Sequence, residues 1–191
     1  MIIKTHMLIG KNAYQNIQEE YNIQLNKKYF MYGNIKPDIT YTLSNKSHRL
    51  QDSLDFVLKE IDKLIMNDEK NIETFSMNLG VINHFLSDFF CAPHYYKGSY
   101  FKNIVKHLRY EFKLNEKFKE MTKKNELSIK ALDITGNLYP NIVTTIHSLE
   151  TEYQKASVNI ENDIKFAITL CTQINRQILN QIIIKNQKVA A

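Results

Sequence analysis

Apolar residues recur every three or four positions through most of this 191-residue chain, which is the spacing of one face of an α-helix. The chain has only 5 Gly and 3 Pro, a composition that favours long helices and few tight turns. Its length is typical of one domain. We therefore predict an all-α fold, a single-domain multi-helix bundle over residues 1–191. The predicted helices lie at about residues 5–21, 24–31, 48–65, 72–90, 100–119, 126–132, 139–155 and 159–184.

The segment from Gly80 to His94 reads Gly-Val-Ile-Asn-His-Phe-Leu-Ser-Asp-Phe-Phe-Cys-Ala-Pro-His. His84 and Asp88 are four positions apart, so on a helix they lie on the same face, one turn from each other. The residues around them are apolar, which predicts a buried helix, and a buried His and Asp both need a partner. A metal ion would satisfy both. Pro93 is expected to stop this helix, which leaves His94 directly after it as a further candidate ligand.

A second pair, His107 and Glu111, repeats the spacing of four. His6 and His48 lie at predicted helix starts, and Asp38 follows a predicted glycine turn. Imidazole and carboxylate are good zinc ligands, and a site with three protein ligands leaves room for a water molecule. Taken singly, either pair fits a surface or core hydrogen-bond pair better than a ligand pair, because this spacing is common on amphipathic helices. The two pairs, together with His94 after the proline and Asp38 after the glycine turn, favour a metal site.

These elements resemble the zinc-dependent phospholipase C family, which shares its architecture with the S1/P1 nucleases. They follow the family's order and cover about residues 5–111, whereas the C-terminal third is similar only in being helical. The matching elements are Thr5-His6-Met7-Leu8-Ile9, Gly33-Asn34-Ile35-Lys36-Pro37-Asp38, Ser47-His48, the Gly80–His94 segment, and His107 with Glu111.

The resemblance implies a cluster of two or three zinc ions held by eight side chains. These are Asp38, His48, His84 and Asp88 for the first ion, His94, His107 and Glu111 for the second, and His6 with a shared Asp88 for the third. Secreted members complete the third site with the amino and carbonyl groups of an N-terminal Trp, and this chain contains no Trp. Asp38 is the candidate catalytic residue, which would orient or deprotonate the attacking water in addition to binding metal.

Closely spaced zinc ions indicate hydrolysis of a phosphate ester, because such ions stabilise both the attacking and the leaving oxygen and lower the pKa of bound water. The family resemblance makes a phospholipid the expected substrate, with transient contact to a membrane surface. A P1-type nuclease or another phosphoesterase is the alternative on the same framework, and nucleic acid is a partner only in that case. A non-catalytic helical protein with structural zinc is the third hypothesis.

Several aromatic residues follow the predicted ligands. Phe89 and Phe90 are expected in the core, whereas Tyr95 and Tyr96, in a predicted loop, fit a substrate pocket and a core position about equally. His147 lies outside every motif and is interpreted as an ordinary surface histidine. The isoleucines along the last predicted helix are expected to pack against the bundle and not on a membrane.

Charge and cysteine content bear on the kind of surface the protein has and on the compartment in which it acts. The formal net charge of +5 is spread along the chain, which indicates a solvated Lys-rich surface and not a nucleic-acid patch. Cys91 and Cys171 make no disulfide framework and suit a reducing compartment, and Cys91 is interpreted as a small buried filler in preference to a soft metal ligand. No membrane-spanning run and no signal-peptide pattern are visible, so we expect a cytoplasmic protein, or a secreted one if a signal peptide has been removed.

Overall fold

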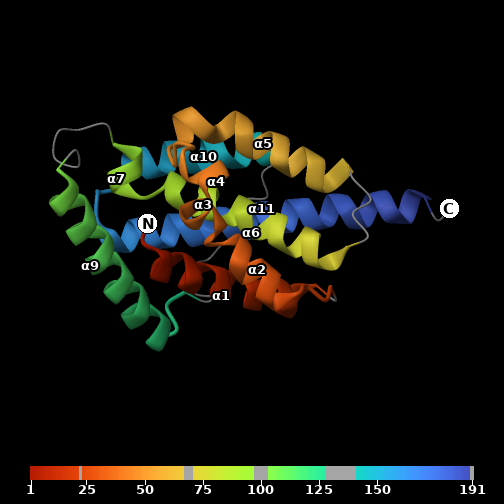
Figure 1. Ribbon diagram of the computed structural model, residues 1–191, viewed down its shortest axis with the longest axis horizontal. Helices are drawn as coiled ribbons and strands as arrows, with labels where there is room; N and C mark the ends of the chain where they lie inside the picture. The colour runs from red at the N-terminus through yellow and green to blue at the C-terminus, as the bar shows by residue number, and fades with distance from the viewer. Residues whose placement is uncertain (22, 67–70, 97–102, 128–140, 190–191) are drawn as a thin grey trace.

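The computed structural model describes the chain except for residues 22, 67–70, 97–102, 128–140 and 190–191. Within the described residues the chain forms ten helices and no strand (Figure 1), which confirms the all-α prediction. The helices are α1 (Ile3–Glu20), α2 (Lys27–Gly33), α3 (Lys36–Ile39), α4 (Tyr41–Ser44), α5 (Leu50–Met66), α6 (Ile72–Phe89), α7 (Ala92–Tyr95), α9 (Ile104–Lys123), α10 (Ile142–Lys155) and α11 (Ile160–Val189). The predicted helix over residues 126–132 falls mostly outside the described part of the chain.

Asparagine side chains set the starts of four helices. The side-chain oxygens of Asn26, Asn71, Asn103 and Asn141 accept hydrogen bonds from backbone N–H groups in the first turns of α2, α6, α9 and α10. Asn is among the best N-cap residues because it satisfies N–H groups that have no partner within the helix. Three of these helices therefore begin three or four residues later than the apolar spacing predicts.

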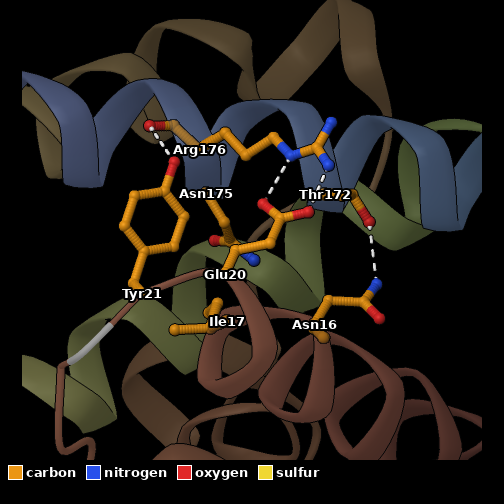
Figure 2. Close-up of a pocket in the computed structure, with 8 residues that line it drawn as sticks. Asn16, Ile17, Glu20, Tyr21, Thr172, Asn175 and Arg176 are labelled. Atoms are coloured by element: carbon orange, nitrogen blue, oxygen red, sulfur yellow. Dashed lines mark hydrogen bonds and ion pairs between the residues drawn. The ribbon is translucent and has the colours of Figure 1, made fainter. Parts of the chain in front are cut away.

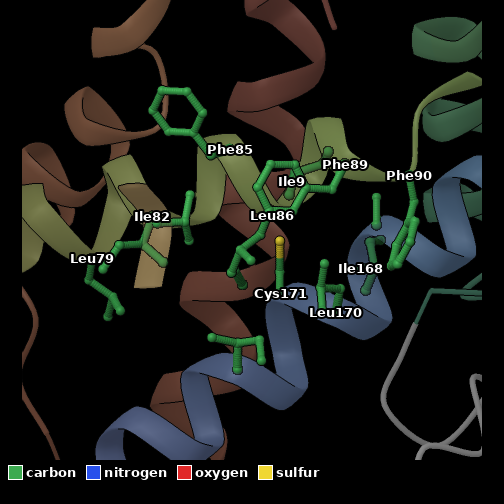
Figure 3. Packing of buried hydrophobic residues seen from close by; sticks show 14 of the residues in the cluster. Ile9, Leu79, Ile82, Phe85, Leu86, Phe89, Phe90, Ile168, Leu170 and Cys171 are labelled. Carbon is green, nitrogen blue, oxygen red and sulfur yellow. The ribbon is translucent and has the colours of Figure 1, made fainter. Parts of the chain in front are cut away.

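Helix α6 is the centre of the fold and contacts α1, α2, α5 and α11. Its side chains pack against those of α1 and α11 in the core (Figure 3), and the predicted core residues Phe89 and Phe90 are both fully buried. Ile168 and other isoleucines of α11 are buried as predicted. No helix in the described part of the chain is long and apolar enough to cross a bilayer.

Two glycines bring α2 against α6. Gly33 is the last residue of α2 and is buried against Gly80 of α6; a Cβ on Gly33 would clash with the Met77 carbonyl, and one on Gly80 with the Phe30 carbonyl. None of the described glycines has a positive φ. The predicted glycine turn is therefore wrong in its reason, since Gly33 is needed for its size and not for its conformation. The following helix, α3, also contacts α6, and its Asp38 lies near His84.

Pro93 has a different role from the predicted one. Helix α6 ends at Phe89, and Pro93 lies in the first turn of α7, where a missing N–H group has no consequence. Pro93 thus begins the short helix that carries His94.

Tyr95 also belongs to α7 and is buried, with its hydroxyl donating to Glu150 and accepting from Gln154, so it is a core residue and not part of a loop at the site.

Candidate metal centre

The structure brings all eight predicted side chains together in one place, which we call the ligand cluster. Six separate segments supply them: α1, α3, the residues before α5, α6, α7 and α9. Each cluster side chain lies within 4.0 Å of another member of opposite type, carboxylate to imidazole. Three members, His6, His84 and Asp88, are fully buried, whereas the side chains of Asp38 and His107 remain 19% and 22% exposed. The cluster is therefore buried on one side and reachable by solvent on the other.

Asp88 lies at the centre of the cluster and uses its two oxygens in different directions. Its Oδ2 is 2.8 Å from Nδ1 of His48, 3.5 Å from Nε2 of His6 and 3.6 Å from Nε2 of His84. Its Oδ1 contacts the Met1 amino group and lies 3.7 Å from Nε2 of His94. One carboxylate therefore faces both halves of the cluster, as the shared ligand of two ions would.

The orientation of His84 is fixed by a backbone carbonyl. Its Nδ1 lies 2.9 Å from the oxygen of Asn34, which follows α2. Because a carbonyl only accepts, Nδ1 carries the proton and Nε2 presents its lone pair to the cluster. A hydrogen bond of this kind to the second ring nitrogen is typical of metal-binding histidines. The close contact between α2 and α6 is what brings the Asn34 carbonyl within reach.

His6 has the same arrangement through a hydroxyl group. The Ser87 hydroxyl donates its proton to the His84 carbonyl over 2.8 Å, and Ser87 Oγ also lies 3.2 Å from Nδ1 of His6. Since the hydroxyl has one proton, Nδ1 of His6 must donate in the second contact. Its Nε2 therefore also directs a lone pair into the cluster.

His94, His107 and Glu111 form the other half of the cluster. Glu111 Oε1 lies 3.1 Å from Nε2 of His94 and 2.8 Å from Nε2 of His107. His107 and Glu111 are one turn apart on α9, as their spacing predicts, whereas His94 comes from α7. The sulfur of Cys91 lies within 4.8 Å of the ligand atoms of His94 and Glu111.

Two ligand atoms of the cluster are buried without a hydrogen-bond partner. They are Nε2 of His6 and Oδ2 of Asp38, which lie 3.9 Å apart. Buried polar atoms nearly always have a partner, and leaving one unsatisfied costs about 1–3 kcal/mol. A cation between these atoms would satisfy both, so the residues present fit a zinc ion.

The electrostatic environment favours the protonation states that metal binding needs. Burial raises the pKa of Asp88, but the Met1 ammonium and the nearby imidazoles lower it more, so the net pKa is well below its usual range. Burial and the neighbouring His6 lower the pKa of His84. The carboxylate is therefore ionised and the imidazole neutral. Asp38 differs, because burial raises its pKa and makes it a better proton acceptor than an ordinary aspartate.

The Met1 amino group is a member of the site that the sequence pattern does not reveal. It is fully buried, contacts Asp88, and lies 2.9 Å from Nε2 of His94 and 3.4 Å from Glu111. Burial lowers its pKa, but the carboxylates of Asp88 and Glu111 outweigh this effect and raise it to about 11. The amino group thus lies beside Asp88, His94 and Glu111, whereas the family resemblance pairs the N-terminus with His6.

Two features outside the cluster carry no comparable chemistry. A cavity between α1 and α11 has a volume of about 10 Å³ and is crossed by the ion pair of Glu20 and Arg176 (Figure 2). That volume is about the minimum for one water molecule. His147 is exposed, as predicted, and lies 3.4 Å from the Glu150 carboxylate. Neither feature competes with the ligand cluster as a functional site.

The comparison with known proteins agrees with this geometry. The family model of zinc-dependent phospholipase C matches residues 5–160, which include the whole ligand cluster and all of α10. No curated protein and no solved structure matches the chain. Because the family model covers most of its length, the chain belongs to the zinc-dependent phospholipase C family.

Proposed function

We propose that this protein hydrolyses the phosphate ester of a phospholipid at a cluster of two or three zinc ions. The observation that carries the proposal is the convergence of eight zinc-type ligands, two of them with buried atoms that have no hydrogen-bond partner. Family membership supports both zinc and a phospholipid substrate.

The ligand assignment follows the two faces of Asp88. Asp38, His48 and His84 would hold one ion together with Asp88, and three of these residues have ligand atoms within 4.8 Å of one another. The ligand atoms of His6, His84 and Asp88 form a second such group. His94, His107 and Glu111 would hold a further ion. When bound, zinc supplies a water of lowered pKa and positive charge next to the phosphate.

Asp38 would accept the proton in the reaction. Its pKa is raised by burial, so the carboxylate oxygen that does not bind zinc can take a proton from a water molecule beside the cluster. As the water oxygen forms a bond to phosphorus, the P–O bond on the glycerol side breaks. The proton then passes from Asp38 to the departing glycerol oxygen, which leaves as an alcohol.

Helix α9 provides a surface that suits a bilayer. Ile104, Val105, Leu108 and Phe112 lie on one side of its first three turns and are 65%, 59%, 41% and 58% exposed. Exposed apolar groups of this size commonly mark interaction sites. The exposed cations nearby are Lys106, Arg109 and Lys113. Two copies of this surface would repel each other, whereas an anionic phospholipid surface attracts it.

The bilayer contact can be tested apart from hydrolysis. Leu108→Ser with Phe112→Ser should weaken sedimentation with vesicles of phosphatidylcholine and phosphatidylglycerol several-fold, and leave turnover of a dispersed short-chain phospholipid unchanged. Val143→Ser, on the exposed side of α10, is the matched control. Equal sedimentation of the double variant and the control would show that α9 is not the surface in contact.

The two alternatives predict different assays. A nuclease needs aromatic groups on which bases stack, and burial of Tyr95 removes one of the two candidates. Structural zinc predicts that a chelator unfolds the protein. The proposal predicts instead that a chelator stops turnover of phosphatidylcholine while helicity is retained. Cleavage of single-stranded DNA with no cleavage of phospholipid would overturn it.

We also propose that the protein acts in a reducing compartment such as the cytoplasm, because Cys91 and Cys171 are both buried free thiols.

A further inference from the structure

Cys91 occupies the junction between the two halves of the ligand cluster. It precedes α7, and its backbone N–H donates to the Asp88 carbonyl over 3.1 Å. Its own carbonyl accepts from the N–H groups of His94 and Tyr95, each over 2.8 Å. The side chain is fully buried, and its sulfur lies within 4.8 Å of the ligand atoms of His94 and Glu111. The backbone of Cys91 is therefore held directly to that of one ligand on each side.

The other cysteine has a different environment. Cys171 is also buried, but its thiol donates to the Asn83 carbonyl over 3.6 Å. The thiol of Cys91 makes no hydrogen bond within the described residues, and its sulfur lies within 4.8 Å of ligand atoms of two cluster members, His94 and Glu111. A small apolar filler would explain the burial of Cys91, but it would not need to lie among zinc-type ligands.

We propose that Cys91 supplies a thiolate ligand to the ion held by His94 and Glu111. Zinc binds thiolate sulfur at about 2.3 Å and imidazole nitrogen at about 2.0 Å, so ligand atoms around one tetrahedral ion lie about 3.5 Å apart. His94 Nε2 and Glu111 Oε1 are already 3.1 Å apart, so the Cys91 sulfur, within 4.8 Å of ligand atoms of both residues, would have to move closer by about 1 Å, within the reach of side-chain rotation. Binding of the ion would release the thiol proton to solvent.

A sulfur ligand would change which ion of the cluster can bind a water molecule. With Cys91, His94, His107 and Glu111 this ion would have four protein ligands, and a tetrahedral zinc site with four protein ligands is closed to water. The ion would then hold α7 and α9 together. The reactive water would belong to the half of the cluster that contains Asp38. This inference rests on the proposed zinc cluster, because it concerns one of its ions.

Cobalt provides the test, because thiolate bound to Co²⁺ gives an intense near-ultraviolet charge-transfer band that imidazole and carboxylate do not give. The full-length protein is loaded with Co²⁺, and the metal content and the absorption spectrum are measured together. The expected result is a band in the unchanged protein and in Cys171→Ala, and loss of the band in Cys91→Ala and Cys91→Ser.

Bound Co²⁺ without the band in the unchanged protein would overturn the thiolate inference and leave the zinc cluster standing. The same holds if the band persists in Cys91→Ser. Failure of the unchanged protein to bind any Co²⁺ or Zn²⁺ would overturn the proposed function and this inference with it. The spectra of the unchanged protein and of Cys171→Ala together decide the matter even if the Cys91 variants do not fold, because a band retained in Cys171→Ala can come only from Cys91.

Discussion

Two fully buried aspartates, Asp88 on α6 and Asp163 on α11, have opposite surroundings. Asp88 faces imidazoles and an ammonium group, and its carboxylate spans the two halves of the ligand cluster. Asp163 accepts hydrogen bonds from the Tyr153 hydroxyl at 2.7 Å, the Tyr110 hydroxyl at 2.9 Å and the Ala92 N–H at 2.7 Å. The first carboxylate is surrounded by groups that can bind a metal, and the second by neutral donors alone.

The difference appears in the pKa values as well. Nearby cations lower the pKa of Asp88 in spite of its burial, whereas burial dominates at Asp163 and raises its pKa to about 6. Burial of a charged group therefore does not identify a functional site. The chemistry of the partners distinguishes the two aspartates, since the donors around Asp163 satisfy both of its oxygens while atoms beside Asp88 remain without a partner. Asp163 connects α7, α9 and α10 to α11 and is a scaffold residue.

The largest effect is expected from Asp88→Asn, which keeps the shape of the side chain and removes its charge. Metal content should fall to at most one ion per chain. Turnover should fall by more than about 100-fold, because loss of a residue that only orients a metal ligand already costs about 10–100-fold. Elemental analysis and phosphatidylcholine hydrolysis measure the two effects, with His147→Ala as the control. Full activity in a metal-depleted Asp88→Asn protein would remove the distinction between the two aspartates.

The next effect is expected from Asp38→Asn, which tests the proton acceptor. The amide can still bind weakly through its oxygen but cannot accept a proton, so turnover should fall by about 10²–10⁴-fold. KM should change little, and the ions held by other residues should be retained. If the variant loses activity only in proportion to its metal loss, Asp38 is a ligand and nothing more.

A smaller effect, on stability alone, is expected from Asp163→Asn. The amide nitrogen would face a donor, so the free energy of unfolding should decrease by about 1–3 kcal/mol. Metal content should match that of the unchanged protein, and turnover should stay within a few-fold. Denaturant titration followed by circular dichroism measures the loss. A zinc-depleted but stable variant would place Asp163 in the site and contradict its role as scaffold.

The last effect is the pH dependence that Asp163 confers. Its pKa is raised from 3.8 in the unfolded chain to about 6 in the fold, so the folded state binds the proton more tightly. The resulting stabilisation is fully present below about pH 4 and is lost as the pH rises to about 6. The stability of the unchanged protein relative to Asp163→Asn should therefore decrease over this interval and level off above it. A difference that increases with pH would mean that Tyr110, Tyr153 and Ala92 stabilise the charged form more than burial penalises it.

The candidate ligands could be found in the sequence because the signals of two pairs are local. His84 with Asp88, and His107 with Glu111, follow the spacing of four within single helices, and the structure places both pairs in the cluster. The other four candidates, His6, Asp38, His48 and His94, were identified from the order of the segments and the family resemblance. The apolar spacing also predicted the main helices. Helix starts were shifted by asparagine caps, which a count of apolar positions does not register.

The residues that orient the candidate ligands could not be predicted, because their contacts depend on how helices cross. The Asn34 carbonyl lies 50 residues from His84 in sequence, and Ser87 lies 81 residues from His6. The close contact of Gly33 with Gly80 creates the first of these pairs. Asp163 likewise accepts from Ala92, 71 residues away. No spacing rule within one helix could identify these partners.

Metal content of the purified chain tests the central claim most directly. Elemental analysis of the unchanged protein after incubation with excess zinc should give two or three ions per chain, and Asp163→Asn should give the same number. Asp88→Asn should give one ion or none. An unchanged protein that retains no zinc under these conditions would mean that the eight side chains form a hydrogen-bonded core and not a metal centre.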